Sequence, residues 1–327
     1  MRSRIAWVFV AGCYLLMLFG RAWPQELRKT DAEYVGVSLA AFWVRTFEFH
    51  IGAGLLAATA IGFLTGPRRP ALALAPLAAW CLLAEFNPAQ RAVRPPAAGE
   101  RLRIVSANLL AWNEELSAIA DEIRAARPDV LLLQEYTPRA RSVFQASSRE
   151  ALPHADEHVR DDTFGMAIFS NRPFLRPVEL LNLGGSGTPH QKAVIEFAGR
   201  ELTILNLHVC PPISIHFERL QRLEIADLLD VLDAGSGPRV VGGDFNFTRN
   251  SFFGDELARR GLVDTHELAG HGRGVTWSVR GWRRYVPGVR IDHVYLSDEL
   301  TATFSATGVG TGSDHRPVIA ELAFCAP

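Results

Sequence analysis

The sequence has little cysteine. Its only cysteines in 327 residues are Cys13, Cys81, Cys210 and Cys325. None of them forms a CxxC pair or another spacing typical of thiolate metal sites, so a cysteine-ligated metal centre is excluded. Cys210 and Cys325 both lie in the second half of the chain. We predict that they can form a disulfide if the body is in an oxidising compartment.

A large net charge is also missing, since the formal charge of the whole chain is −1. The charges are nevertheless unevenly distributed. Residues 1–99 carry 10 Lys+Arg and 5 Asp+Glu, whereas residues 100–327 carry 24 and 30. Residues 1–99, which we call the front, are therefore basic, and residues 100–327, the body, are acidic. An acidic body argues against a general nucleic-acid binder, which usually presents a basic face. The chain also lacks internal repeats and low-complexity tracts.

Long hydrophobic runs are confined to the front. The runs are Ile5–Gly20, Ile51–Thr65 and Ala71–Phe86, and Gly66–Pro70 joins the last two. The last two runs are each about 15 residues long, short of the ~20 that a spanning helix needs, so flanking residues must complete each span. The first run is also compatible with a signal peptide. For the other two, the alternative is a pair of buried soluble helices.

We predict a membrane region over residues 1–90, a linker over residues 91–100 and a catalytic domain over residues 101–327. The membrane region would contain two or three transmembrane helices, at about 5–22, 50–66 and 70–86. Between the first two, Val35–His50 mixes aromatic and charged residues, and we predict an amphipathic interfacial helix or an extension of the second span.

Cationic loops predict the orientation. Arg2, Arg4, Arg68 and Arg69 should face the cytoplasm, so three spans would place the body outside an inner or plasma membrane. Four arginines that follow the third span oppose this orientation, namely Arg91, Arg94, Arg101 and Arg103. The sequence implies a lipid bilayer as a partner and no protein partner.

The body begins with a strand, a helix and a second strand. Leu102–Asn108 alternates polar and apolar residues, and Asp129–Gln134 is a continuous apolar run typical of a strand covered on both faces. Between them Leu116, Ile119, Ala120 and Ile123 have helical spacing, with Asn113 as the expected cap and Pro128 as the stop. This order is typical of a layered α/β domain with its site at strand ends.

The remaining patterns continue this architecture. Strands are predicted at Gly165–Ser170, Gln191–Phe197, Glu201–Leu207, Arg239–Val241, Ile291–Leu296 and Val318–Leu322, and a helix at Ile215–Leu232. After Arg239–Val241, Gly242 and Gly243 are expected to stop the strand. If extended geometry persists, Asp244 and Asn246 share one face and Phe245 lies on the other. The alternative is an Asx-rich turn.

Chemically capable side chains occur at nearly every strand end. The set comprises Asn108, Glu135, His208, Asp244, Asn246, Asp292, Asp314 and His315. Four carboxylates that converge on one cleft would repel one another without a cation. Because hard oxygen ligands dominate, the cation is predicted to be Mg²⁺ or Mn²⁺. Glu135 is the first choice as ligand, with Asn108 and Asp314 assisting.

The same set offers groups for proton transfer. His315 beside Asp292 is a candidate general base for a water molecule, and Asp244 is an alternative acceptor or relay for that proton. His208 is suited to donate to a phosphoryl oxygen or leaving group, and Asn246 to orient the phosphate. With Lewis-acid help from the metal, these groups would support in-line attack of water on a phosphorus ester.

Six short segments carry a family resemblance. They are SANL (106–109), LLLQE (131–135), NLH (206–208), GGDFN (242–246), RIDHVYLS (290–297) and SDHRPV (313–318). In this order they resemble the endonuclease/exonuclease/phosphatase superfamily, which contains pancreatic deoxyribonuclease, abasic-site endonucleases, neutral sphingomyelinases and inositol-polyphosphate 5-phosphatases. The resemblance covers about Arg101–Ala326.

The resemblance implies an α/β fold, a four-layer α/β/β/α sandwich of two mixed sheets, and a Mg²⁺-dependent phosphoesterase. It also implies metal binding at Glu135, an Asp292–His315 pair, and phosphate contacts from Asn108, Asn246 and His208. Members differ on whether the Asp244 equivalent or the histidine activates water, so this role stays open. The other histidines match no catalytic position. We expect His293 to pack, and expect surface or loop positions for His154, His158, His190, His216, His266 and His271.

The substrate class has three candidate interpretations. The first is a phosphoester of a lipid headgroup or small molecule near the bilayer, and the second is a nucleic acid. The second rests on a basic aromatic segment composed of Arg273, Trp277, Arg280, Trp282, Arg283, Arg284, Tyr285 and Arg290. From this segment we take Arg290 as a substrate-binding residue. The third interpretation is a non-catalytic, membrane-anchored binding module.

Overall fold

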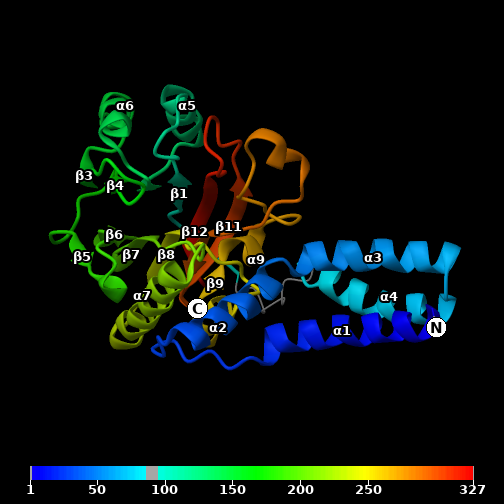
Figure 1. Cartoon of the computed structure of the whole chain (residues 1–327). Helices are drawn as coiled ribbons and strands as arrows, with labels where there is room; N and C mark the ends of the chain where they lie inside the picture. Colours follow the sequence, from blue (N-terminus) through cyan, green and yellow to red (C-terminus); the bar gives the residue numbers. More distant parts are fainter. Residues whose placement is uncertain (1, 86–94, 327) are drawn as a thin grey trace.

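Four helices precede the body of the protein. The structure is a computed structural model that describes residues 2–85 and 95–326. The helices are α1 (Arg2–Ala22), α2 (Ala32–Thr46), α3 (Glu48–Thr65) and α4 (Arg68–Leu83). Helices α1, α3 and α4 lie side by side and extend away from the body, whereas α2 lies against the body (Figure 1).

Small and apolar side chains hold the three extended helices together. Val10 and Met17 of α1 are buried in one cluster with Leu55 of α3 and Leu74 of α4. Gly52 permits a close approach of α3 and α4, because a Cβ there would lie 2.8 Å from the Cβ of Cys81. The two helices formed by the second and third apolar runs therefore pack together as a hairpin.

Among the described residues, two helices are long and apolar enough to cross a membrane. These spans are Ser3–Ala22 and Glu48–Thr65. Helix α4 has 16 residues and contains Pro76, and it is shorter than these two spans. The predicted third span ends at residue 86, and the predicted linker starts at residue 91. Both positions lie outside the described residues.

Helix α2 is a separate element and not an extension of α3, so the second of our two alternatives for this segment is excluded. Asp31 caps its N-terminus through a hydrogen bond from the Tyr34 amide, and Phe47 separates it from α3. Its Phe42 is buried in the same cluster as Leu205 and Val241 of the body. Burial of an apolar aromatic side chain therefore attaches α2 to the body.

The body contains two six-stranded sheets. The first has the order β11-β12-β1-β2-β4-β3 and the second β5-β6-β7-β8-β10-β9. The first contains β1 (Leu102–Asn108), β2 (Val130–Gln134), β3 (His154–His158), β4 (Met166–Ser170), β11 (Leu300–Thr307) and β12 (Val318–Phe324). The second contains β5 (Glu179–Leu181), β6 (His190–Phe197), β7 (Arg200–His208), β8 (Arg239–Asp244), β9 (Val263–Asp264) and β10 (Asp292–Leu296).

Helices cover the outer face of each sheet. The helices and short helical turns of the body are α5 (Leu116–Ala126), α6 (Pro138–Ser148), η1 (Leu183–Gly185), α7 (Ile215–Ala234), α8 (Phe252–Arg259), α9 (Thr265–Ala269) and η2 (Gly281–Tyr285). Ile119 of α5 and Phe144 of α6 pack on Leu131 of β2, and Ile225 of α7 packs on Leu205 of β7. Since β1–β2 and β7–β8 are parallel and their other neighbours antiparallel, both sheets are mixed. The predicted α/β sandwich is confirmed.

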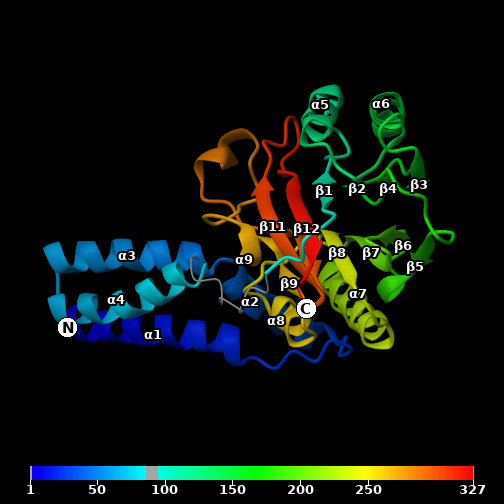
Figure 2. The same ribbon diagram turned by 180° about the vertical axis from the view of Figure 1, so that it is seen from behind.

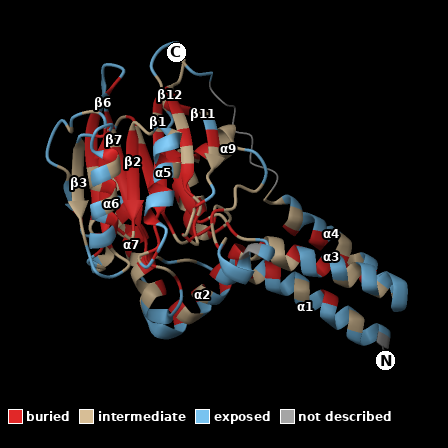
Figure 3. Ribbon diagram, turned by 90° about the horizontal axis from the view of Figure 1, so that it is seen from above, coloured by how far each residue is buried: buried red, intermediate tan, exposed pale blue. Residues whose placement is uncertain are grey.

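The main core lies between the sheets. Ile104 and Leu132 of the first sheet pack against Ile195 and Val240 of the second, and Figure 3 shows buried residues concentrated in the strands. Gly242 lets the two sheets approach closely here, because a Cβ at this position would lie 2.6 Å from Leu132 Cδ1. Contrary to our expectation, the two glycines do not stop the strand, because β8 continues to Asp244.

Two further expectations are corrected. Asn113 does not cap α5, whose N-cap residue is Glu115. Instead, Asn113 accepts a hydrogen bond from the Glu115 amide in a turn before the helix. Cys210 and Cys325 do not form the predicted disulfide. Cys210 is buried with its Sγ 3.5 Å from Glu224 Oε1, whereas Cys325 Sγ contacts the carbonyl of Asp298.

Candidate active site

Strand register brings the predicted residues to one edge of the two sheets. Asn108 pairs with Gln134 in the parallel β1–β2 ladder, so the next residue, Glu135, follows directly at the strand end. In the second sheet, His208 pairs with Asp244. On the other side of β8, Asp292 also pairs with Asp244. Three strands of the second sheet thus deliver their polar side chains at a single level.

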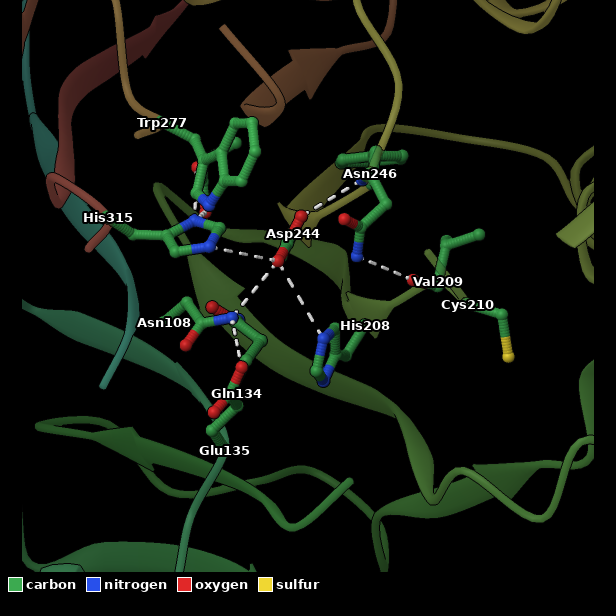
Figure 4. A network of polar contacts seen from close by, with 12 residues as sticks. Asn108, Gln134, Glu135, His208, Val209, Cys210, Asp244, Asn246, Trp277 and His315 are labelled. Carbon is green, nitrogen blue, oxygen red and sulfur yellow. Dashed lines mark hydrogen bonds and ion pairs between the residues drawn. The ribbon is translucent and has the colours of Figure 1, made fainter. Parts of the chain in front are cut away.

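Asn108 connects the two sheets. Its Nδ2 donates to Glu135 Oε1 at 3.0 Å and to Asp244 Oδ2 at 3.0 Å (Figure 4). The second oxygen of Glu135 accepts from the Ala111 amide at 2.7 Å. Glu135 itself has a φ of 57°, a left-handed conformation that is uncommon for a non-glycine residue. Such a backbone, held by surrounding contacts, is frequent at functional sites.

Asp244 and Asn246 follow the second interpretation of their spacing, an Asx turn. Asp244 Oδ1 accepts from the Asn246 amide at 2.9 Å, and the φ of Asn246 is 52°. The chain therefore makes an Asx turn after β8, and extended geometry does not persist. Both side chains nevertheless line the same cavity, and Phe245 is buried in the opposite direction beneath α7.

His315 is held by Asp292. Its Nδ1 lies 2.9 Å from Asp292 Oδ2, and its Nε2 lies 3.8 Å from Asp244 Oδ2. The hydroxyl of Ser313 accepts from the His315 amide and donates to the Asn108 carbonyl, which ties this loop to β1. With Nδ1 directed at a carboxylate, Nε2 is the nitrogen of His315 that faces the other polar groups.

His208 approaches the same carboxylate from β7. Its Nε2 lies 3.7 Å from Asp244 Oδ2, so two imidazoles flank one oxygen (Figure 4). Behind it lies His190, which is completely buried and not at the surface, contrary to our expectation. His190 Nδ1 accepts from the His208 amide, and its Nε2 lies 3.3 Å from Glu224 Oε1. The only sequence signal for this support was the position of His190 directly before a predicted strand.

Asp314 faces the site from the loop before β12. Its Oδ2 accepts from the indole Nε1 of Trp277 at 3.1 Å. Trp277 belongs to the segment that we had assigned to nucleic-acid binding. Its indole N–H instead orients a carboxylate, and no local pattern in the sequence indicates that pairing. Thr276, also missed, accepts from the Asp292 amide through its Oγ1.

Burial and neighbouring charges give His208 and His315 different protonation states. Burial and the nearby His190 and His315 lower the pKa of His208 to about 3, which favours neutral imidazole. Burial also opposes the charged form of His315, but the carboxylates of Asp292 and Asp244 outweigh it and raise the pKa of His315. The site therefore pairs a neutral imidazole with a cationic one on opposite sides of Asp244.

The carboxylates are shifted as well. Burial, reinforced by the negative charge of Asp292, raises the pKa of Asp244. Burial also raises the pKa of Glu135, although the Ala111 amide and Asn108 oppose the shift. For Asp292 the cation of His315 overcomes burial and lowers the pKa. Perturbed carboxyl groups gathered in one cleft are typical of functional sites.

The side chains present fit a hard divalent cation. Asp244, Asp292 and His315 offer ligand atoms that all lie within 4.8 Å of one another. Glu135 and Asn108 form a second candidate pair on the other side of Asp244, with oxygen atoms of the type that Mg²⁺ and Mn²⁺ prefer. Because Asp292 and His315 already hydrogen-bond each other, a cation at the first group would have to compete with that bond.

Most of these groups line one cavity of about 320 Å³. Its polar lining consists of Thr46, Glu135, Thr163, His208, Asp244, Asn246, Asp314 and His315. Asn108 and Asp292 reach the same groups through the hydrogen bonds described above. The sequence therefore predicted residues that the fold does bring together, with one exception.

The exception is Arg290, which does not line this cavity. Its guanidinium donates to both carboxylate oxygens of Asp264 at 3.1 Å, and Arg290 lines a different cavity beside His266 and Arg273. Our assignment of Arg290 to the substrate is therefore corrected, since its charge is already neutralised. As expected, His293 packs, with Nδ1 2.5 Å from Asp264 Oδ2.

A sequence profile described as the endonuclease/exonuclease/phosphatase family matches residues 99–315. No curated protein sequence matches the chain.

Solved structures give the same picture at the level of the fold. An endonuclease/exonuclease/phosphatase from Beutenbergia cavernae DSM 12333 has a TM-score of 0.56 and 20% identity, covering 70% of this chain and 72% of that one. A truncated Caenorhabditis elegans TDP2 has a TM-score of 0.56 and 19% identity, covering 69% and 98%. D. rerio TDP2 complexed with single-strand DNA product has a TM-score of 0.55 and 18% identity, covering 68% and 99%.

Proposed function

The chain belongs to the endonuclease/exonuclease/phosphatase family, and from this premise we propose that it is a membrane-anchored phosphoester hydrolase that depends on Mg²⁺ or Mn²⁺. Members of this family are metal-dependent hydrolases of phosphoester bonds. In the proposed reaction, water attacks phosphorus in line with the leaving oxygen. A new phosphorus–oxygen bond forms as the bond to the leaving group breaks.

One observation carries the proposal. Asp244 stands between two imidazoles and is joined through Asn108 to Glu135. A buried carboxylate with such neighbours is well placed to interact with a phosphoryl group and its attacking water. A purely structural cluster would have little reason to leave two imidazole nitrogens facing a cavity.

Different residues of the chain have different roles in proton transfer and hydrogen bonding. We assign Asp244 as the acceptor of the proton that the attacking water loses, because its carboxylate oxygen faces the cavity between the two imidazoles. His315, oriented by Asp292, then donates from Nε2 to a phosphoryl oxygen and stabilises its developing negative charge. His208 supplies a neutral N–H on the opposite side, and Asn246 orients the phosphate.

Glu135 and Asn108 are the residues that would hold the metal, with Asp314 assisting. A divalent cation there supplies Lewis-acid polarisation of the phosphoryl group. Asn108 also restrains Glu135 and Asp244 through its amide, so one side chain couples the proposed metal ligand to the proposed base. Such supporting hydrogen bonds orient metal ligands and tune them.

The membrane part of the proposal rests on the helical front. Besides the two apolar candidate spans, large apolar side chains such as Val8, Leu15 and Leu64 are exposed on their outer faces. Exposed apolar surface of this extent is costly in water and favourable in a bilayer. The proposal is a multi-pass protein whose catalytic domain lies outside the cytoplasm.

A nuclease remains the alternative function, supported by the similarity of the fold to D. rerio TDP2, which was solved with single-strand DNA product. The basic aromatic segment supports it less than expected. Arg290 of this segment is already paired with Asp264. Arg273 also has partners within the protein, because it pairs with Glu85 and donates to the Gly288 carbonyl. A non-catalytic binding module is the third alternative.

Hydrolysis of bis-p-nitrophenyl phosphate by the full chain in detergent tests the proposed chemistry. We expect turnover with Mg²⁺ or Mn²⁺, loss of turnover with EDTA, and recovery on adding the metal back. Turnover that survives EDTA would contradict the metal dependence, and no turnover with either metal would favour the binding module. Plasmid DNA tests the nuclease alternative, whose cleavage should fall steeply with salt.

A further inference from the structure

The junction between α2 and α3 forms one wall of the catalytic cavity. Phe42, Trp43, Thr46 and Phe47 line the cavity that also contains Glu135, Asp244 and His315. The family profile begins only at residue 99, so this wall comes from a part of the chain outside the family match. The helical front is therefore a component of the active site as well as a candidate anchor.

Packing holds this wall in place. Phe42 lies 5.9 Å from the ring of Phe253 in the body, and Arg45 pairs with Asp255 at 2.9 Å. Trp43 stacks on Phe47 with ring centroids 5.3 Å apart and an angle of 8° between the planes. Because one aromatic side chain is buried against the body, the stacked pair next to it is presented to the cavity in a defined position.

Loops of the body complete an apolar rim. Trp112 follows β1, Phe164 precedes β4, and Ile213 precedes α7, and all three line the cavity. Trp112 and Ile213 are 63% and 69% exposed, unusually high for such large apolar side chains. None of the described residues that line the cavity is a lysine or an arginine. A polyanionic strand would therefore meet carboxylates and aromatic rings, and His315 would be the one cationic side chain among the described residues of the lining.

The wall is continuous with the apolar helices. Helix α3 starts at Glu48, directly after Phe47, and runs away from the body beside α4 (Figures 1 and 2). A bilayer around the three extended helices would therefore have one surface near the cavity mouth. Aromatic residues at that end, including Trp43, are typical of a membrane–water interface.

We propose that the α2–α3 junction binds the apolar portion of an amphiphilic phosphodiester, taken from the surface of the bilayer. Trp43, Phe47 and Ile213 contact the hydrocarbon part, while the phosphoryl group lies at Asp244 and His315. This inference rests on the proposed hydrolase function and adds its substrate class. Apolar contact at the wall determines selectivity, because burial of hydrocarbon is favourable in proportion to its area.

Three p-nitrophenyl diesters with a common leaving group test the proposal: the hexadecyl, the thymidine-5′ and the methyl ester of p-nitrophenyl phosphate. The full chain is assayed with Mn²⁺ at one fixed detergent concentration, so that partitioning is the same for every variant. We expect kcat/KM for the hexadecyl ester to exceed that for the methyl ester at least tenfold. In Trp43→Ala this ratio should fall about tenfold, mainly through KM.

Two further variants make the test specific. Ile213→Ser changes an exposed loop residue of the body that also lines the cavity, and it should lower the ratio as well, even if Trp43→Ala fails to fold. Trp7→Ala removes an indole of α1 that is 47% exposed and lies outside the cavity. It should leave the ratio and the turnover unchanged.

The remaining outcomes are distinguishable. Equal kcat/KM values for the three esters would overturn the inference and leave the hydrolase function intact. A preference for the thymidine ester that is lost in Trp43→Ala would also overturn it, because the wall would then stack nucleobases. Failure to hydrolyse any of the esters would instead overturn the proposed function itself.

Discussion

His315 Nδ1 and Asp292 Oδ2 lie 2.9 Å apart, both buried, at the level where β10 pairs with β8. This bond directs the other ring nitrogen of His315 toward Asp244. A carboxylate in this arrangement fixes both the tautomer and the orientation of the imidazole, and it stabilises the imidazolium form. The pair therefore accounts for how His315 is kept ready to donate a proton.

Asp292→Asn should lower kcat about 100-fold or more with little change in KM. The amide keeps the size of the side chain, but it no longer stabilises the charged imidazole, which is needed mainly in the transition state. The measurement is hydrolysis of bis-p-nitrophenyl phosphate at saturating Mn²⁺. Asp161→Asn, which changes an exposed aspartate, is the matched control. Retention of half the wild-type kcat in Asp292→Asn would exclude this role.

Glu135→Gln should weaken Mn²⁺ binding at least tenfold, because the amide carries no negative charge for the cation. Free Mn²⁺ measured by electron paramagnetic resonance reports binding independently of turnover. Glu114→Gln, at an exposed position, should bind as the wild type does. If Asp292→Asn abolishes binding and Glu135→Gln leaves it unchanged, the cation occupies the Asp244, Asp292 and His315 group instead.

Asp264→Asn should destabilise the body by about 3 kcal/mol at pH 7, because it leaves the Arg290 guanidinium without its buried carboxylate. Burial would raise the pKa of Asp264, but Arg290 and His293 outweigh it and lower that pKa. The ionised carboxylate thus stabilises the fold above its unfolded pKa of about 4, and this contribution is lost as the pH falls below that value.

Unfolding by urea at pH 7 and at pH 3 measures this difference. The gap between wild type and Asp264→Asn should be smaller at pH 3 than at pH 7. Asp233→Asn is the control, since Asp233 pairs with Arg260 on the surface with its side chain 54% exposed. A gap that stays constant across this range would show that the charge of Asp264 does not contribute.

The orientation of the helical front predicts a catalytic body outside the cytoplasm. The N-terminus of α1 and the turn between α3 and α4 lie at the same end of the bundle, away from the body (Figure 2). Arg4, Arg68 and Arg69 belong to that end, which the positive-inside rule places in the cytoplasm. Alkaline phosphatase fused after the body should be active, and green fluorescent protein fused there should be dark. The reverse pattern would refute this orientation.

Much of the fold was predictable because its strands have strong local patterns. The predicted and observed bounds of β1 coincide at Leu102–Asn108, and β2 is the continuous apolar run that was expected. The sequence did not reveal β3, because all five of its residues are only partly buried and none is a large apolar residue. Helix α6 was also missed, since it buries only Ala140, Phe144 and Ser148.

The sequence by itself determined which chemical groups the site contains. Strand periodicity and the residues that end each strand are local properties, and Asn108, Glu135, His208 and Asp244 follow from them, whereas His315 comes from the turn before the last strand. Parallel neighbours then meet at one edge, because their carboxyl ends coincide.

Only the tertiary structure decided which partner each side chain has. Arg290 is neutralised by Asp264 of the two-residue strand β9, and His190 is buried against Glu224 of α7. Likewise, α2 joins the cavity because its Phe42 finds an apolar surface on the body. Periodicity specifies that a side chain must be buried or paired. The partner depends on segments far away along the chain, whose position is set by packing of the whole molecule.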